Sequence, residues 1–328
     1  MNRTDTVDLA VVKQDQQAMW ASGDFGVIAS LIHPVAERLV DRTDLAAGSR
    51  VLDVAGGTGN AAIAAARCGC HVTCTDFVPA LLERGRERAR AERLDIDFEP
   101  ADAEALPYDD GAVDAVLSVF GAMFAPDQSR AAAELARVCR HGGLIGLACW
   151  TPEGFLGEWF RTTAAHVPPP AGVASPMRWG TGDGVAELLG DQVRTVRTRR
   201  RRFTFRFLDA PAFVNAFRSH YGPTVKAFDA AGPRATVLQH DLRTRRTRRP
   251  PPRGRDRRTR GVSRSRRRPP MTAAASWSPE QRSERSADHT RAVRRKHRSP
   301  PTRCALGVVL MLERLRSTAS ARAPSDPG

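Results

Sequence analysis

Residues 51–60, with the sequence VLDVAGGTGN, combine a carboxylate with a glycine-rich turn. Glycine has no side chain and tolerates unusual dihedral angles, so the backbone of such a turn can approach a ligand closely. Residues 57–62 also fit the dinucleotide pattern G-x-G-x-x-A. Because Asp53 precedes the turn, its charge would repel the pyrophosphate of a dinucleotide and attract a cation. The turn therefore favours a ligand with positive charge at this point.

Two further carboxylates follow predicted strands and suit the sugar and base of a nucleoside. Asp76 lies 17 residues beyond Gly59, where an acidic side chain can accept hydrogen bonds from both ribose hydroxyls. Asp102 follows the next strand and is placed to accept from an adenine amino group. S-adenosylmethionine contains both groups, has no phosphate, and carries an ammonium and a sulfonium cation. It is compatible with all three carboxylates, whereas NAD conflicts with Asp53.

The elements that position these residues alternate along the chain. Short apolar runs predict strands at 50–54, 71–75, 96–99, 113–119 and 144–149, and apolar spacing or alanine content predicts helices at 61–67, 79–93 and 127–140. Strands that alternate with helices form a parallel sheet covered on both faces. The sequence therefore predicts an α/β class, with a Rossmann-like, mostly parallel sheet and helices on both faces.

The flanks of this core divide the chain into three predicted parts. Residues 1–45 form a helical entry segment, and residues 46–242 form the ligand-binding domain. Within that domain, residues 151–191 are predicted to be an irregular segment over the open end of the sheet, followed by one or two strands at 193–207 and a helix at 210–228. Residues 243–328 form an Arg/Pro-rich tail that is predicted to be disordered, apart from a short helix at 304–315.

Nearly all positive charge lies in that tail. The net charge of +15 divides into −4 for residues 1–242 and +19 for residues 243–328. A polybasic arm would bind nucleic acid through its phosphates. The abrupt change of composition favours another hypothesis, in which the tail is an off-frame extension without a catalytic role, because GC-rich coding sequence read in a wrong frame tends to give this composition. Nucleic acid is therefore expected as a partner only through the tail.

The short apolar runs and the spacing of the cysteines argue against a membrane protein and a zinc protein. No apolar run approaches the ~20 residues of a membrane span, so we expect a cytoplasmic protein without a membrane partner. The segment CGCHVTC at 68–74 contains possible zinc ligands, but the second half of a zinc site is missing. We therefore expect reduced cysteines and no metal.

Four segments together resemble the class I S-adenosylmethionine-dependent methyltransferases: VLDVAGGTGN, TDFVPALLERGRERA, ADAEALPYDDGAVDAVLSVFGAMFAPD and ELARVCRHGGLIGLACWTPEGF. The resemblance covers about residues 20–230 and is nearest to the ubiquinone/menaquinone C-methyltransferase branch at 55–59. Two positions depart from the commoner pattern, since Ala55 replaces a glycine and His141 replaces a proline. Neither departure is expected to prevent cofactor binding.

The resemblance also implies which residues bind the cofactor. Asp53, Gly57 and Gly59 would line its methionine end, Asp76 its ribose, Asp102 and Ala103 its adenine, and Ser118 and Val119 the floor near the sulfonium. The complete expected set is Asp53, Ala55, Gly56, Gly57, Gly59, Asp76, Phe77, Asp102, Ala103, Ser118 and Val119.

The predicted function is methyl transfer from S-adenosylmethionine to a small-molecule acceptor. Holding the acceptor and the methyl group in line can supply most of the catalysis. A general base is needed only if the acceptor must lose a proton, and His166, His220 and Tyr221 are the candidates. Two alternatives are a nucleic-acid-binding protein or RNA methyltransferase that uses the basic tail, and an NAD-dependent oxidoreductase.

Overall fold

A seven-stranded sheet forms the centre of the protein in a computed structural model that describes residues 8–245 and 302–315. The strand order is β3-β2-β1-β4-β5-β7-β6. The strands are β1 (Arg50–Val54), β2 (His71–Asp76), β3 (Ile96–Pro100), β4 (Val113–Val119), β5 (Cys139–Trp150), β6 (Val193–Phe207) and β7 (Thr302–Leu315).

The five strands β1–β5 are parallel, as their apolar runs predict. β1 lies between β2 and β4, and Asp53 is in register with Cys74 on one side and Leu117 on the other. The side chains of Leu52, Val54 and Leu117 are completely buried, because helices cover both faces of this sheet. Parallel pairing brings the carboxyl ends of β1, β2 and β4 to one edge. The turn after β1 therefore lies at this edge.

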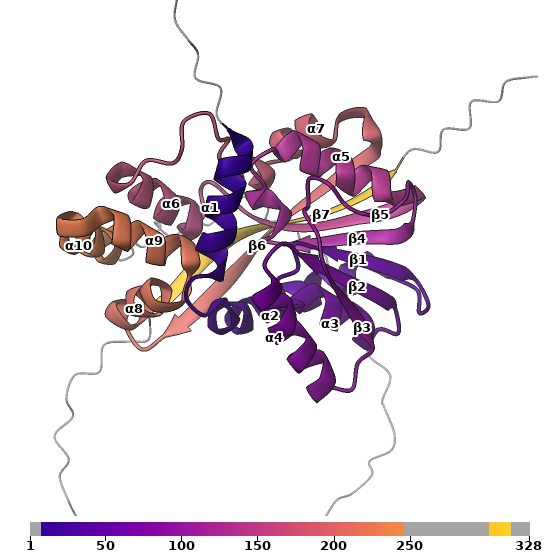
Figure 1. The fold of residues 1–328 in the computed structure, drawn as a ribbon, viewed down its shortest axis with the longest axis horizontal. Coiled ribbons are helices and arrows are strands. Elements are labelled where there is room, and N and C mark those ends of the chain that lie inside the picture. Colours follow the sequence, from indigo (N-terminus) through magenta and orange to yellow (C-terminus); the bar gives the residue numbers. More distant parts are fainter. Residues whose placement is uncertain (1–7, 246–301, 316–328) are drawn as a thin grey trace, which may run out of the picture. The chain divides into compact units, whose positions relative to one another are not determined.

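Helices cover the two faces of the sheet (Figure 1). α2 (Phe25–Thr43), α3 (Asn60–Arg67) and α4 (Pro79–Ala91) lie on one face, and α5 (Gln128–Val138) and α7 (Gly182–Leu189) lie on the other. This arrangement confirms the predicted fold class. Within residues 8–245 and 302–315, no helix combines the length and the apolar character that crossing a membrane requires.

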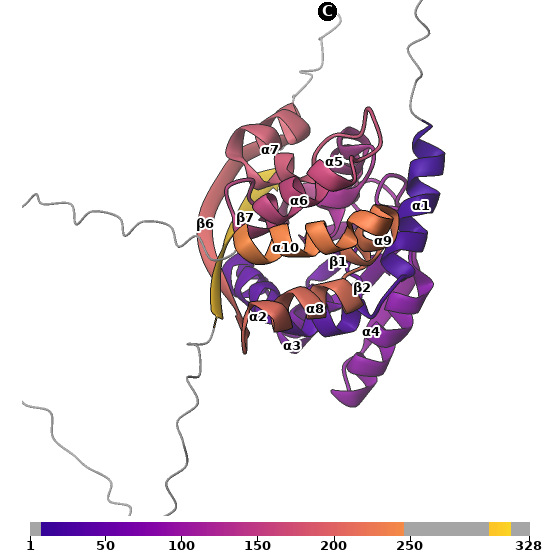
Figure 2. The same ribbon diagram turned by 90° about the vertical axis from the view of Figure 1, so that its left-hand side faces the viewer.

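A second group of helices gathers beyond the carboxyl edge of the sheet (Figures 1 and 2). It contains α1 (Leu9–Ala21), α6 (Phe155–His166), α8 (Ala210–His220), α9 (Gly222–Ala231) and α10 (Ala235–Arg245). The segment 151–191, expected to be irregular, thus contains helices α6 and α7. The single helix expected at 210–228 is two helices, and a Cβ atom on Gly222 at their junction would lie 2.1 Å from the carbonyl oxygen of Met19.

Residues 302–315 form a strand where the sequence pattern predicted a short helix. β7 pairs antiparallel with both β5 and β6 inside the sheet. The prediction of a helix is wrong because a short apolar run has the same pattern in a buried strand as in a helix. Part of the predicted tail therefore completes the sheet, and residues 243–245 continue α10. The prediction of disorder for residues 246–301 and 316–328 lies outside the described residues.

Candidate functional site

The turn between β1 and α3 has a backbone that requires small residues. Gly57 and Gly59 have φ angles of 60° and 77°, and Ala55 adopts a φ of 51°, a region that side chains disfavour. A Cβ atom on Gly56 would lie 2.6 Å from the sulfur of Cys74 and 2.7 Å from Oδ2 of Asp53. Only glycine fits at this position without displacing the neighbouring side chains. Close packing therefore explains why glycine stands at position 56. Because glycine has no side chain, the backbone of the turn stays accessible to a ligand.

Asp53 is buried at the end of β1 with one oxygen that lacks a partner. Its Oδ2 accepts a hydrogen bond of 2.9 Å from the backbone N–H of Ala62 in the first turn of α3. Its Oδ1 is buried and has no hydrogen-bond partner among the residues that the structure describes. Burial raises the pKa of this carboxyl to about 7, and the charge of nearby Asp76 adds to the shift. A buried acceptor without a partner costs free energy, so this atom points to a donor or cation from outside the chain.

Asp76 ends β2 and braces the same turn. Its Oδ2 accepts from the backbone N–H of Gly57 and its Oδ1 from that of Val78, each at 2.9 Å. Burial raises its pKa to about 6. Each carboxylate oxygen can accept a second hydrogen bond, so Asp76 can bind a ligand hydroxyl while it holds the turn.

Asp102 is bound to the N-terminal helix. Nζ of Lys13 lies 2.5 Å from Oδ2 of Asp102 and 2.6 Å from Oε2 of Glu104. Oδ1 of Asp102 accepts from the backbone N–H of Glu104 at 2.9 Å. Gln17 on the same helix donates to the carbonyl oxygen of Phe77. α1 therefore closes one side of the site through polar contacts with the loops after β2 and β3.

These residues surround a cavity that is partly open to solvent, with about 870 Å³ of empty space when the open part is included. Nine of the eleven expected cofactor residues line it: Asp53, Ala55, Gly56, Gly57, Asp76, Phe77, Asp102, Ala103 and Val119. Their common feature is a position at the carboxyl end of β1, β2, β3 or β4. Ligands of open parallel sheets bind at this edge, so the cavity is the candidate cofactor site.

Two of the expected cofactor residues do not line the cavity. Ser118 is buried and bridges two elements, since its hydroxyl donates to the carbonyl oxygen of Val54 at 2.7 Å and accepts from the N–H of Ala122 at 2.9 Å. Ser118 does not line the cavity because side chains alternate along β4, and Val119 is the neighbour that does. Gly59 lies behind the turn, where its Cβ position is 3.1 Å from the ring of Phe98.

The structure separates the three candidate bases. His166 ends α6, and its Nε2 lies 2.9 Å from Oδ2 of Asp241 on α10. Neither His166 nor His220 lines the cofactor cavity. Tyr221 is buried among aromatic rings next to that cavity. None of the three lines the cofactor cavity, and Tyr221 lines only the smaller cavity beside it.

Several lining residues were missed by sequence reasoning. Lys13, Gln16, Trp20 and Phe25 come from α1 and α2, and Phe120 and Phe124 follow β4. The aromatic residues carry the only available signal, because Trp20 and Phe25 stand near the ends of predicted helices. That signal is also typical of an ordinary core, so their place in the cavity depends on the tertiary fold.

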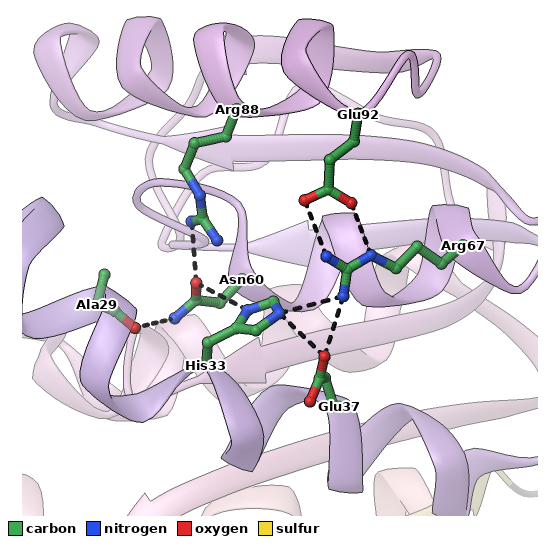
Figure 3. A network of polar contacts seen from close by, with 7 residues as sticks. All are labelled: Ala29, His33, Glu37, Asn60, Arg67, Arg88 and Glu92. Atoms are coloured by element: carbon green, nitrogen blue, oxygen red, sulfur yellow. Dashed lines mark hydrogen bonds and ion pairs between the residues drawn. The ribbon is translucent and has the colours of Figure 1, made fainter. Parts of the chain in front are cut away.

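A polar network holds the glycine turn from its outer side (Figure 3). Arg88 on α4 donates to the carbonyl oxygen of Thr58 at 2.6 Å and to Oδ1 of Asn60 at 2.9 Å. The side-chain amide of Asn60 in turn donates to the carbonyl oxygen of Ala29 on α2 at 2.9 Å. The network therefore ties α2, α3 and α4 to the turn, and its members Ala29, Thr58 and Asn60 also line the cavity.

Replacing Arg88 by alanine should weaken cofactor binding indirectly. The change removes hydrogen bonds to a partly buried charged group, which typically contribute about 1.5–3 kcal/mol, and leaves Oδ1 of Asn60 with only its 3.3 Å contact to Nδ1 of His33. We expect a lower melting temperature and a higher Kd for S-adenosylhomocysteine, measured by calorimetry. Arg90→Ala on the same helix is the control, since its side chain is 73% exposed. Equal effects of the two variants would contradict a role for the network.

Comparisons with known proteins indicate a methyltransferase domain. Residues 51–143 match a family model described as a methyltransferase domain. The chain is 43% identical over 228 residues to the uncharacterized protein Rv1403c of Mycobacterium tuberculosis, which covers 69% of this chain and 83% of that protein. It is 41% identical over 127 residues to the demethylmenaquinone methyltransferase of Deinococcus radiodurans, which covers 38% of this chain and 53% of that enzyme.

Solved structures show the same fold. The crystal structure of the YcgJ protein of Bacillus subtilis aligns with a TM-score of 0.52 at 17% identity, over 87% of this chain and 99% of that one. A methyltransferase-like protein of Bacillus halodurans aligns with a TM-score of 0.50 at 16% identity, over 86% and 99% of the two chains. Together with the sequence matches and the glycine turn, these findings show that the chain belongs to the class I S-adenosylmethionine-dependent methyltransferase family.

Proposed function

We propose that the protein transfers a methyl group from S-adenosylmethionine to a small-molecule acceptor. The observation that carries the proposal is the unpartnered Oδ1 of Asp53, buried beside the cofactor cavity. An ammonium or sulfonium group nearby would satisfy this oxygen and stabilise its charged form. The cofactor supplies an electrophilic methyl group on a sulfonium centre.

The other lining residues fit the rest of this cofactor. Asp76 keeps a lone pair on each oxygen beyond the hydrogen bonds from Gly57 and Val78, so it can accept from ribose hydroxyls. Asp102 and Ala103 line the same cavity where the adenine is expected. Lys13 pairs with both Asp102 and Glu104 there, so its charge offsets one of the two negative charges at this end of the cavity.

A dinucleotide fits this site poorly. The first turn of a helix offers backbone N–H groups that commonly bind phosphate. In this protein the N–H of Ala62 is already bound to the carboxylate of Asp53. A pyrophosphate would meet that carboxylate and the nearby Asp76 without a compensating cation. The geometry therefore favours S-adenosylmethionine over NAD.

The acceptor is proposed to be a small molecule rather than a nucleic acid. The cofactor cavity is concave and lined mainly by apolar and aromatic side chains with a few carboxylates, which is typical of sites for small molecules. Residues 1–242 carry a net charge of −4, and this sign opposes binding of a phosphate backbone.

Calorimetry with S-adenosylmethionine, S-adenosylhomocysteine and NAD tests the proposal. The first two should bind with a stoichiometry of one and NAD should not. Asp76→Ala should weaken S-adenosylhomocysteine binding by about 1.5–3 kcal/mol, the typical contribution of hydrogen bonds to a charged group. Asp97→Ala on β3, an exposed carboxylate outside the cavity, should leave the affinity unchanged. Binding of NAD alone would overturn the proposal.

A further inference from the structure

Strand β6 stands at the edge of the sheet, and seven of its fifteen residues are arginines. Charged side chains on an edge strand commonly prevent sheets from pairing edge to edge. Protection of the edge accounts for arginine on this strand, but it requires no particular arrangement of the arginines around a neighbouring helix.

The register of the sheet shows which face Arg197 occupies. Through β7, Arg197 is in register with Gly146 of β5, and residues directly opposite one another in a sheet point to the same face. A Cβ atom on Gly146 would lie 3.2 Å from the side chain of Thr43 on α2. Arg197 therefore lies on the face of the sheet that α2 covers.

Alternation along the strand places two more arginines on this face. Side chains at every second position of a strand share a face, so Arg199 and Arg201 follow Arg197. The position between them and Arg197 confirms the alternation, because Thr198 lies 3.9 Å from the Cβ position of Gly182 on α7, which covers the opposite face.

Helix α2 contributes two arginines to the same place. Arg38 and Arg42 are exposed and lie four residues apart, so they are neighbours on one side of the helix. Partial desolvation lowers the pKa of Arg201, and the charges of Arg199, Arg42 and Arg38 lower it further. We call Arg38, Arg42, Arg197, Arg199 and Arg201 the arginine cluster.

No carboxylate among the residues that the structure describes forms an ion pair with the arginine cluster. Glu37 on α2 is bound instead to Arg67 and His33, and Asp41 on the same helix is exposed. By contrast, nine other arginines of the described chain form ion pairs. Like charges repel one another, so this cluster lacks the negative charge that would offset its repulsion.

The chemistry of the cluster indicates the class of ligand. Guanidinium groups bind phosphate oxygens through paired hydrogen bonds, and five of them exceed the charge of a single phosphate. A long polyanion is a poorer match, because residues 1–242 carry a net charge of −4. We propose that the arginine cluster is a binding site for a small molecule that carries a diphosphate or triphosphate group.

This site is separate from the cofactor cavity, which none of the five arginines lines. The proposal therefore does not depend on the identity of the cofactor. A phosphate group held here would bridge α2 and β6, which are close together only in the folded chain. Such a ligand binds the folded state alone and raises the melting temperature.

Thermal denaturation and calorimetry of the full-length protein test the site with inorganic pyrophosphate and tripolyphosphate. Residues 243–328 carry a net charge of +19 and attract anions in the folded and the unfolded chain, so the melting temperature is the decisive measurement. At about ten times its Kd, pyrophosphate should raise the melting temperature by about 3 °C. Sulfate at the same ionic strength should raise it less.

Variants of β6 locate the effect. Arg199→Gln with Arg201→Gln should abolish the rise and weaken pyrophosphate binding about 10- to 100-fold. Without ligand this variant should melt at a higher temperature than wild type, because it relieves repulsion. Arg202→Gln with Arg206→Gln is the matched control, since it removes the same charge from the opposite face of the same strand. Arg199→Lys with Arg201→Lys keeps the charge but should also weaken binding, because lysine lacks the planar fork.

Each outcome supports or overturns the site. A rise in melting temperature that survives Arg199→Gln with Arg201→Gln overturns it, and so does an equal loss in the control variant, which would indicate only a diffuse positive field. Full binding by the lysine variant overturns paired hydrogen bonds to phosphate. A single-stranded DNA of 20 nucleotides that binds through Arg199 and Arg201 more tightly than tripolyphosphate would replace the small ligand by nucleic acid. Affinity for S-adenosylhomocysteine should stay unchanged in all variants, and its absence in wild type would bear on the proposed function alone.

Discussion

Replacing Asp53 by asparagine is expected to reduce affinity for S-adenosylmethionine by about 100-fold, a loss near the upper end for hydrogen bonds to a charged group. Asparagine can keep the hydrogen bond from the N–H of Ala62, but it cannot supply a negative charge to the cation. Affinity for free adenosine, which lacks the methionine end, should change much less. Calorimetry with the two ligands measures the difference. If both affinities fall equally, Asp53 supports the turn rather than the cation.

The same substitution should stabilise the ligand-free protein. The pKa of Asp53 is about 7 in the folded protein, against about 3.9 for an unfolded chain. The folded state therefore binds more protons between these values, and Asp53 reduces stability progressively as pH rises from about 4 to 7. Above pH 7 the full cost of the buried charge is present. Asp53→Asn should raise the free energy of unfolding at pH 8 by an amount on the order of 2 kcal/mol.

Urea denaturation at pH 5 and pH 8 measures this effect. The gain in stability should be larger at pH 8 than at pH 5, because the carboxyl is mostly protonated at pH 5. Wild-type affinity for S-adenosylmethionine should fall below pH 7 for the same reason, since the ligand must then displace a proton. A variant that is less stable than wild type at pH 8 would contradict the assigned environment of Asp53.

Removing strand β7 is expected to abolish the fold. A chain that ends at residue 301 loses a strand that pairs with residues 144–150 of β5 and with most of β6. Both neighbours would expose unpaired backbone groups along their edges, and such edges promote aggregation. A chain that ends at residue 315 retains every described strand and is the matched control.

Soluble yield, circular dichroism and S-adenosylhomocysteine binding compare the two truncated proteins. The shorter chain should aggregate or lose cooperative unfolding, and the longer chain should bind like the full-length protein. Composition alone predicts the opposite result, namely that residues 243–328 contribute nothing to catalysis and that their removal leaves the affinity for S-adenosylmethionine unchanged. If the shorter chain folds and binds normally, β7 is dispensable. The off-frame hypothesis stays a prediction for residues 246–301 and 316–328, and translation of the gene in its other frames near codon 240 tests it.

The sequence by itself determined the parallel core and the local part of the site. The strands at 50–54 and 113–119 were predicted at their observed bounds, because continuous apolar runs are typical of strands buried on both faces. Asp53 and Gly57 were recognised because strand, turn and helix follow one another within a few residues. Asp76 was found because the end of each parallel strand reaches the same edge of the sheet.

Only the tertiary structure decided what surrounds that core. A small cavity beside the cofactor site is lined by Trp20, Phe120, Trp150 and Tyr221, which lie far apart in the chain and have ordinary core patterns in the sequence. The strand at 302–315 required partners, since an isolated apolar run is equally compatible with a helix. The side chain of Ser118 points away from the cavity, because its orientation depends on the pleat of β4 and on its hydrogen bond with the backbone N–H of Ala122. Local pattern determines which elements form, whereas contacts between distant segments determine which side chains share a cavity.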